Sequence, residues 1–124
     1  MITLYGIKTC GSVKKAITLL DKHSIPFDFI DLKTHSLQDS LIQSWIKQKG
    51  IAIVLNNKGT TYKKLKKEGI ITDEQTDIKA QISLLKQYPL LLKRPIITAP
   101  NTLIIGYDES GILELIQTYQ NQRF

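Results

Sequence analysis

The first 32 residues restrict the fold more than any other part of the chain. Ile2–Tyr5 is a short apolar run typical of a strand, Gly6–Thr9 indicates a loop, and Ser12–Lys22 carries apolar residues at helical spacing. Ser24-Ile25-Pro26 interrupts that helix, and apolar and acidic residues then alternate through Phe27–Leu32 as they do in a strand. A strand, a helix and a second strand in this order predict a parallel pair joined by a right-handed crossover.

The middle of the chain, residues 34–92, has helical spacing and helix-capping residues in place of a strand pattern. We expect three helices connected by a brief apolar stretch and a turn. They are a helix capped by Thr34 or Ser36 that runs to about Gln48, a lysine-rich helix at 61–67, and a helix that starts at Thr72-Asp73-Glu74 and reaches Tyr88; the apolar stretch is Gly50–Asn56 and the turn is NNKGT at 56–60.

The last part of the chain returns to a strand pattern and then ends on a helix. It consists of the Arg94-Pro95 pair, a strand at 96–98, a turn at Ala99-Pro100-Asn101, a strand at 102–105 that completes a hairpin, and a helix capped by Asp108 or Ser110.

This order of elements predicts an α/β protein with the thioredoxin-like fold, βαβ…ββα, carrying a helical insertion between the second and third strands. We expect a single domain over residues 1–124, with a thioredoxin-like core at 1–33 and 93–124 and the helical insert at 34–92. In that fold a cis-proline precedes the third strand beside the active cysteine, and Pro95 occupies this place.

The net charge of the chain says little about the class of its partners. The net charge is +6, and Lys supplies 15 of the 17 basic residues, spread along the sequence. Such a charge suits an anionic partner, but dispersed lysines are more typical of a solvated basic surface. The KKLKK run at 63–67 has Leu65 as its inward residue, so we expect a solvated helix face and no direct nucleic-acid partner.

Cys10 is the only cysteine, so the chain cannot form an internal disulfide. A lone cysteine is typical of a reducing compartment, and no apolar run approaches the ~18 residues of a membrane span. We therefore expect a cytoplasmic monomer with no membrane partner.

Cys10 lies between the loop that follows the first strand and the first helix. At a helix start, unpaired backbone N–H groups and the positive end of the helix dipole stabilise a thiolate, which is the reactive form of cysteine. The alternative is a buried and inert cysteine. Thr9, Gly11 and Ser12 flank it with small or polar side chains typical of a loop, and this favours the reactive interpretation.

Three segments together carry a family resemblance. They are LYGIKTCGSVKKA at 4–16, LNNKGTTYKKL at 55–65, and LKRPI at 92–96 followed by Gly106-Tyr107. In this order they resemble the arsenate reductase and Spx superfamily, and most closely its YffB-type branch, over essentially the whole chain.

The resemblance implies that Cys10 is the nucleophile and that Arg94, before cis-Pro95, binds an anion. Lys58 stands where members of the branch usually have arginine. A guanidinium holds a carboxylate or an oxyanion with two hydrogen bonds, and positive charge near the sulfur lowers the pKa of the thiol. The ammonium of Lys58 keeps the charge and lacks the planar fork.

The activity implied by the resemblance is that of a thiol-dependent oxidoreductase, a glutathione-dependent monothiol reductase. Glutathione is then a co-substrate, with no bound cofactor, because a lone cysteine needs an external thiol to resolve its mixed disulfide. We expect the carboxylates of glutathione to meet Lys58, Arg94 or Lys14. Ser12 and the Gly11 N–H would hydrogen-bond the thiolate or a bound oxyanion.

Two departures from the superfamily narrow the function. Spx resembles a regulator that senses redox state with a Cys-x-x-Cys pair. In this chain Val13 stands where the second cysteine of that pair would be. Glutathione-linked arsenate reductases use three arginines, whereas this chain has only Arg94 and Arg123, and Gly106 falls roughly where one family arginine is expected. We expect no efficient arsenate reduction. The alternative function is a Spx-like regulatory protein that binds the C-terminal domain of the RNA polymerase α-subunit without a redox switch.

Other polar and aromatic residues favour structural roles. His23 and His35 are far apart and have no cysteine or carboxylate at metal-ligand spacing, so we expect no metal site. Trp45 and Tyr62 have the spacing of core or edge aromatics, and Tyr107 fits either core packing or a place in the site.

Overall fold

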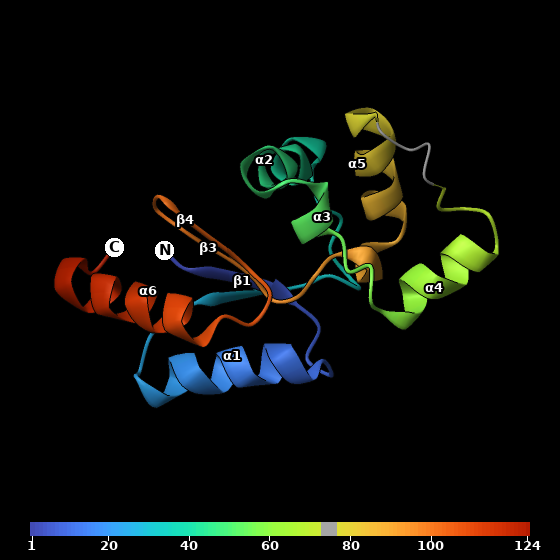
Figure 1. Ribbon diagram of the computed structural model, residues 1–124. Helices are drawn as coiled ribbons and strands as arrows, with labels where there is room; N and C mark the ends of the chain where they lie inside the picture. Colours follow the sequence, from blue (N-terminus) through green and yellow to red (C-terminus); the bar gives the residue numbers. More distant parts are fainter. Residues whose placement is uncertain (73–76) are drawn as a thin grey trace. The chain divides into compact units, whose positions relative to one another are not determined.

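The computed structural model describes residues 1–72 and 77–124. Within these ranges the chain forms one four-stranded mixed sheet, several helices and a single 3-10 helix (Figure 1). It divides into two compact units, one made of Met1–Leu32 with Arg94–Phe124 and the other of Lys33–Lys93. The predicted α/β class and the thioredoxin-like βαβ…ββα order are confirmed.

The first unit contains the whole sheet. Its elements are β1 (Thr3–Gly6), α1 (Gly11–Lys22), β2 (Asp28–Asp31), β3 (Ile96–Ala99), β4 (Thr102–Ile105) and α6 (Glu109–Gln122). The strand order is β2-β1-β3-β4. β1 and β2 are parallel, as the crossover predicted, while β3 pairs antiparallel with both β1 and β4.

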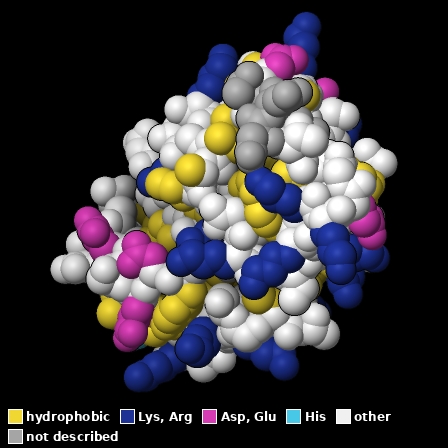
Figure 2. Space-filling view, turned by 45° about the vertical axis from the view of Figure 1, so that its right-hand side comes forward, with side chains coloured by type: hydrophobic (Ala, Val, Ile, Leu, Met, Phe, Trp, Pro, Cys, Tyr) yellow, Lys and Arg dark blue, Asp and Glu magenta, His cyan; other side chains and the backbone are white. Residues whose placement is uncertain are grey.

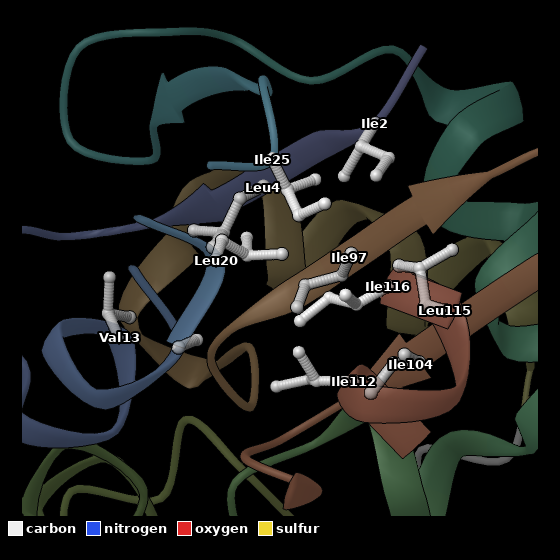
Figure 3. Packing of buried hydrophobic residues seen from close by; sticks show 11 residues of the cluster. Ile2, Leu4, Val13, Leu20, Ile25, Ile97, Ile104, Ile112, Leu115 and Ile116 are labelled. Carbon is white, nitrogen blue, oxygen red and sulfur yellow. The ribbon is translucent and has the colours of Figure 1, made fainter. Parts of the chain in front are cut away.

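The core of the first unit lies between the sheet and the two helices α1 and α6, which contact each other (Figure 3). Period-two alternation sends Ile2 and Leu4 of β1 into this core, and Ile97 of β3 joins them. Burying each such side chain contributes roughly 1.5–3 kcal/mol. The members of the cluster are Ile2, Leu4, Val13, Ala16, Leu20, Ile25, Ile97, Ile104, Ile112, Leu115 and Ile116.

The second unit is almost entirely helical, as predicted. Its elements are α2 (Asp39–Lys49), α3 (Ile51–Val54), α4 (Thr60–Lys67), α5 (Ile78–Gln87) and the 3-10 helix η1 (Pro89–Leu91). An isolated antiparallel bridge joins Leu55 to Leu92. Leu65 is buried, so its predicted inward position is confirmed, and burial of Trp45 agrees with the first of the two alternatives, core or edge, given for it.

Two predicted helix starts in the second unit differ from the structure. α2 begins after Gln38, two residues later than a cap at Ser36 predicts and four residues later than a cap at Thr34 predicts. Residues 35–38 are non-helical, and the side chain of Leu37 among them is buried. α5 begins after Asp77, whose carboxylate accepts from the Lys79 N–H at 3.4 Å. Of the predicted start at Thr72-Asp73-Glu74, the last two residues lie outside the described ranges.

The remaining boundaries agree closely with the prediction. Asp108 caps α6 and accepts from the Gly111 N–H at 3.1 Å, so the first of the two suggested caps is confirmed. The hairpin turn holds Asn101 at φ 57°, a left-handed conformation that asparagine tolerates. None of the helices in the described ranges has the length and apolar composition needed to cross a membrane.

Candidate functional site

Cys10 occupies the junction between β1 and α1. Its backbone is extended, with φ −77° and ψ 127°, and it is the N-cap residue of the helix. The Cys10 N–H donates to the Ile7 carbonyl at 3.1 Å, and the Cys10 carbonyl accepts from the Lys14 N–H at 2.9 Å. The thiol is half-buried. The backbone on both sides therefore holds the sulfur at the start of the helix.

Gly6 allows β1 and α1 to approach closely beneath this junction. A Cβ atom at Gly6 would lie 2.7 Å from Cγ2 of Val13, which is fully buried. Real Cβ atoms do not approach a neighbour so closely, and a buried β-branched side chain has little room to move. Glycine at the end of β1 is thus needed for the packing that positions Cys10.

Arg94 and Pro95, which immediately precede β3, lie near the junction that carries Cys10. β3 is antiparallel to β1, and Tyr5 pairs with Ile96, so the residues that precede β3 lie beside the end of β1. The Arg94-Pro95 peptide bond is cis, which confirms the conformation predicted for Pro95. The Pro95 carbonyl accepts from the Gly106 N–H at 2.8 Å. This arrangement brings the guanidinium of Arg94 to the Cys10 sulfur.

The pKa of the Cys10 thiol is lower than its ordinary value. Partial burial of the sulfur raises the pKa, but stabilisation of the thiolate outweighs it. The stabilising groups are the backbone N–H of Val13, the side chain of Arg94 and the backbone N–H of Ser12. The arrangement favours the thiolate, which is the form of cysteine that acts as a nucleophile.

The N–H groups that act on the sulfur differ in part from those expected. Ser12 contributes its backbone N–H, whereas Val13 takes the part predicted for the Gly11 N–H. An N-cap side chain faces the N–H groups of the second and third helical residues, which here are Ser12 and Val13. Gly11 is exposed, and a Cβ there would meet open space. The capping rule applied to Cys10 would have identified Val13.

The two lysines predicted to bind glutathione lie in different units. Lys14 is exposed on α1, one turn after Cys10. Lys58 belongs to the Lys33–Lys93 unit and is exposed in the turn before α4. That turn is closed by a hydrogen bond of 3.4 Å from the Gly59 N–H to the Asn56 carbonyl.

Neither Gly106, which falls roughly where a family arginine is expected, nor Arg123 supplies a guanidinium beside the Cys10 sulfur. Gly106 has φ 86°, a conformation that favours glycine, and its N–H is bonded to Pro95. Arg123 ends α6, with its guanidinium 5.9 Å from the centre of the Tyr119 ring. Figure 1 places the end of α6 and the start of α1 at opposite ends of the first unit.

Two further features of the described residues concern metal ligands and surface charge. Among the described residues, no group of three His, Cys, Asp or Glu side chains is arranged to hold a metal ion. On the face drawn in Figure 2, Lys and Arg side chains form several separate groups with neutral and hydrophobic atoms between them. This distribution agrees with a solvated basic surface.

Comparisons with known proteins show which family the sequence matches. The model of the ArsC family matches residues 5–115. An uncharacterized protein of Haemophilus influenzae is 33% identical over 109 residues, which cover 88% of this chain and 93% of that protein. The global transcriptional regulator Spx of Streptococcus pneumoniae is 30% identical over 98% of this chain and 91% of its own.

Solved structures show the same likeness. The YFFB protein has a TM-score of 0.78 and 30% identity, and the match covers 98% of this chain and 97% of that one. An arsenate reductase from Vibrio cholerae has a TM-score of 0.74 over 91% of this chain and 95% of its own, and at 22% identity it shows a shared fold.

Proposed function

Because the chain belongs to the ArsC family, we propose that it is a thiol oxidoreductase that acts through Cys10 alone and uses glutathione as its reductant. The observation that carries this proposal is the position of Cys10 as the N-cap of α1, beside Arg94 and cis-Pro95, where the pKa of its thiol is lowered. The chain has no second cysteine with which to form an internal disulfide. An external thiol must therefore complete the reaction.

The proposed reaction has two thiol-disulfide exchanges. The Cys10 thiolate attacks one sulfur of a substrate disulfide, forms a mixed disulfide with it, and releases the other sulfur as a thiolate that takes up a proton. Glutathione thiolate then attacks the bound substrate sulfur and releases Cys10 as thiolate. After these two exchanges one substrate sulfur is a free thiol. The other substrate sulfur is joined to glutathione in a mixed disulfide. A second glutathione frees the remaining substrate thiol in solution and yields glutathione disulfide.

Charged groups near the sulfur support glutathione as the reductant. Glutathione carries two carboxylates; Arg94 places positive charge next to Cys10, and Lys14 is exposed one turn along α1 in the same unit. The family resemblance adds Lys58 as a third cation. We place this reaction in the cytoplasm, where glutathione is reduced, and in a monomer. Arsenate is a poor substrate in this proposal, because the missing arginines leave fewer donors for its oxyanion.

The test is the Cys10→Ser variant. Glutathione-dependent reduction of 2-hydroxyethyl disulfide should disappear, while the cooperative unfolding transition is retained, because the thiol is only half-buried. Turnover that survives in a folded Cys10→Ser protein would overturn the mechanism.

A second candidate function rests on the 30% identity to Spx over 98% of this chain. In that case the chain is a regulatory protein that binds the C-terminal domain of the RNA polymerase α-subunit and lacks a redox switch. A pull-down with that domain separates the two proposals: capture together with no thiol turnover supports the regulator, and turnover without capture supports the reductase.

A further inference from the structure

A groove follows the solvent side of α1 in the first unit and is separate from the contacts of the Cys10 sulfur. Its volume is about 330 Å³. We call it the α1–Tyr107 groove. It is lined by Lys14, Lys15, Thr18, Leu19, Lys22 and Tyr107. Residues 14, 18 and 22 recur every four positions, so they form one stripe along the helix. The helix rise of 1.5 Å per residue makes this stripe about 12 Å long.

The rim of the groove is cationic. Lys14, Lys15 and Lys22 are all exposed, and no ion pair joins them to a carboxylate of the residues that the structure describes. The nearest acid in sequence to Tyr107 is Asp108, and its carboxylate already accepts hydrogen bonds from Gly111 and Ser110. Three exposed lysines therefore surround one concave surface.

The floor of the groove is apolar. Leu19 and Tyr107 are half-buried and pack against the core of the first unit. The ammonium of Lys15 stands over the Tyr107 ring, 5.9 Å from its centre. Tyr107 is the single aromatic side chain among the lining residues, so a nucleic-acid strand would find at most one ring on which to stack a base. A flexible chain with carboxylates and an aliphatic side chain fits this surface better.

We propose that the α1–Tyr107 groove docks an acidic segment of a partner protein. A stripe of about 12 Å accommodates about four residues of extended chain. Carboxylates would meet the lysine rim, and one aliphatic side chain would lie on Leu19 and Tyr107. The groove begins one turn from Cys10, so a docked protein can present a disulfide to the sulfur. This last step rests on the proposed function, whereas docking itself does not.

The test measures binding without turnover. A fluorescein-labelled peptide, Glu-Glu-Leu-Glu-Glu-Glu, is titrated with the full-length protein at low salt, and fluorescence anisotropy reports binding. The double variant Lys15→Gln/Lys22→Gln should weaken binding about fivefold, since each exposed ion pair contributes modestly. The matched control is Lys63→Gln/Lys67→Gln, which removes the same charge from exposed positions on α4 and should change binding less than about twofold.

Several outcomes would overturn the docking proposal. They are equal weakening by the two double variants, no binding of the acidic peptide, and equal binding of the peptide with Gln in place of Glu. Tighter binding of a single-stranded DNA of equal charge, lost in Lys15→Gln/Lys22→Gln, would assign the groove to nucleic acid instead. Failure of peptide binding leaves the thiol chemistry of Cys10 standing, and loss of that chemistry leaves the docking standing.

Discussion

The loop that carries Cys10 and the turn that carries Lys58 both hold predicted site residues, but they are built differently. Cys10 is fixed by backbone hydrogen bonds on both sides and lies above the buried contact of Gly6 with Val13. Lys58 stands exposed in a turn that also has backbone hydrogen bonds, from the Asn56 N–H to the Leu91 carbonyl at 2.7 Å and from the Gly59 N–H to the Asn56 carbonyl at 3.4 Å. The first region acts on a single half-buried sulfur, and the second supplies a charge on an exposed side chain.

This difference bears on how each region tolerates substitution. The groups that lower the pKa of the Cys10 thiol all belong to the first unit. We therefore expect that an arginine-to-lysine difference in the turn of the second unit leaves the reactivity of the sulfur unchanged. Changes at the first region should act on stability and thiol reactivity, and changes at the second on the binding of anions.

The largest expected effect is the loss of stability on replacing Gly6 with alanine, and Gly59→Ala is its comparison. Gly6→Ala should lower the free energy of unfolding by about 2 kcal/mol, because the new Cβ overlaps a buried and rigid Val13. Gly59→Ala creates a contact of the same length, 2.7 Å, but with the amide end of the half-buried Asn56 side chain. It should cost under about 0.5 kcal/mol, because that side chain can move. Urea denaturation measures both.

A compensating substitution checks the cause of the Gly6 effect. Val13→Ala in the Gly6→Ala background makes room for the added methyl, so the double variant should lose less stability than the sum of the two single changes. Equal losses at Gly6 and Gly59, or simple additivity of Gly6→Ala with Val13→Ala, would contradict the contrast between the two regions.

The next effect in size is on the thiol. Arg94→Ala removes a hydrogen bond and a positive charge from the thiolate, so the pKa of Cys10 should rise. The rate of alkylation by iodoacetamide at neutral pH should fall several-fold, because less thiolate is present. Arg123→Ala, which removes an equal charge at the end of α6, is the control and should leave the rate unchanged. A similar fall in both variants would mean that net charge alone sets the reactivity.

Much of the fold could be predicted because its signals are local. The βαβ opening, the hairpin and the Asp108 cap each depend on residues close together in sequence, and all three are confirmed. The start of α2 was predicted wrongly. Thr34 and Ser36 are preferred cap residues, but the helix begins after Gln38, so the preference of a residue type for the cap position did not decide this boundary.

The site could be predicted only in part. Cys10 was recognisable because a cysteine before a helix has a physical consequence, and the lowered pKa of its thiol agrees with it. The contribution of the Val13 N–H was missed because it comes from the backbone. The approach of Arg94 depends on the antiparallel pairing of Tyr5 with Ile96, and residues so distant in sequence reveal no register. The roles of Arg94 and Lys58 in anion binding stay predictions.

A smaller effect is the pH dependence of stability. The folded pKa of Cys10 is below the ordinary value of about 8.5, so the unfolded chain binds more protons between the two pKa values. The contribution to stability is therefore complete above the ordinary value and is lost as the pH falls through the folded one. Wild-type protein should gain a little stability over Cys10→Ser as the pH rises through this window. A flat difference in urea denaturation would contradict the lowered pKa.

The smallest effect is expected at Lys58, and it sharpens the comparison most directly. Lys58→Ala should leave the pH profile of Cys10 alkylation unchanged, because the groups that act on the sulfur lie in the other unit. The KM for glutathione should rise about twofold, which is the usual worth of one exposed ion pair. Lys58→Arg should lower that KM by a similar factor, because a guanidinium can hold a carboxylate with two hydrogen bonds. A shift of the alkylation profile in either variant would show that the turn of the second unit acts on the sulfur, and the division between fixed chemistry and adjustable charge would not hold.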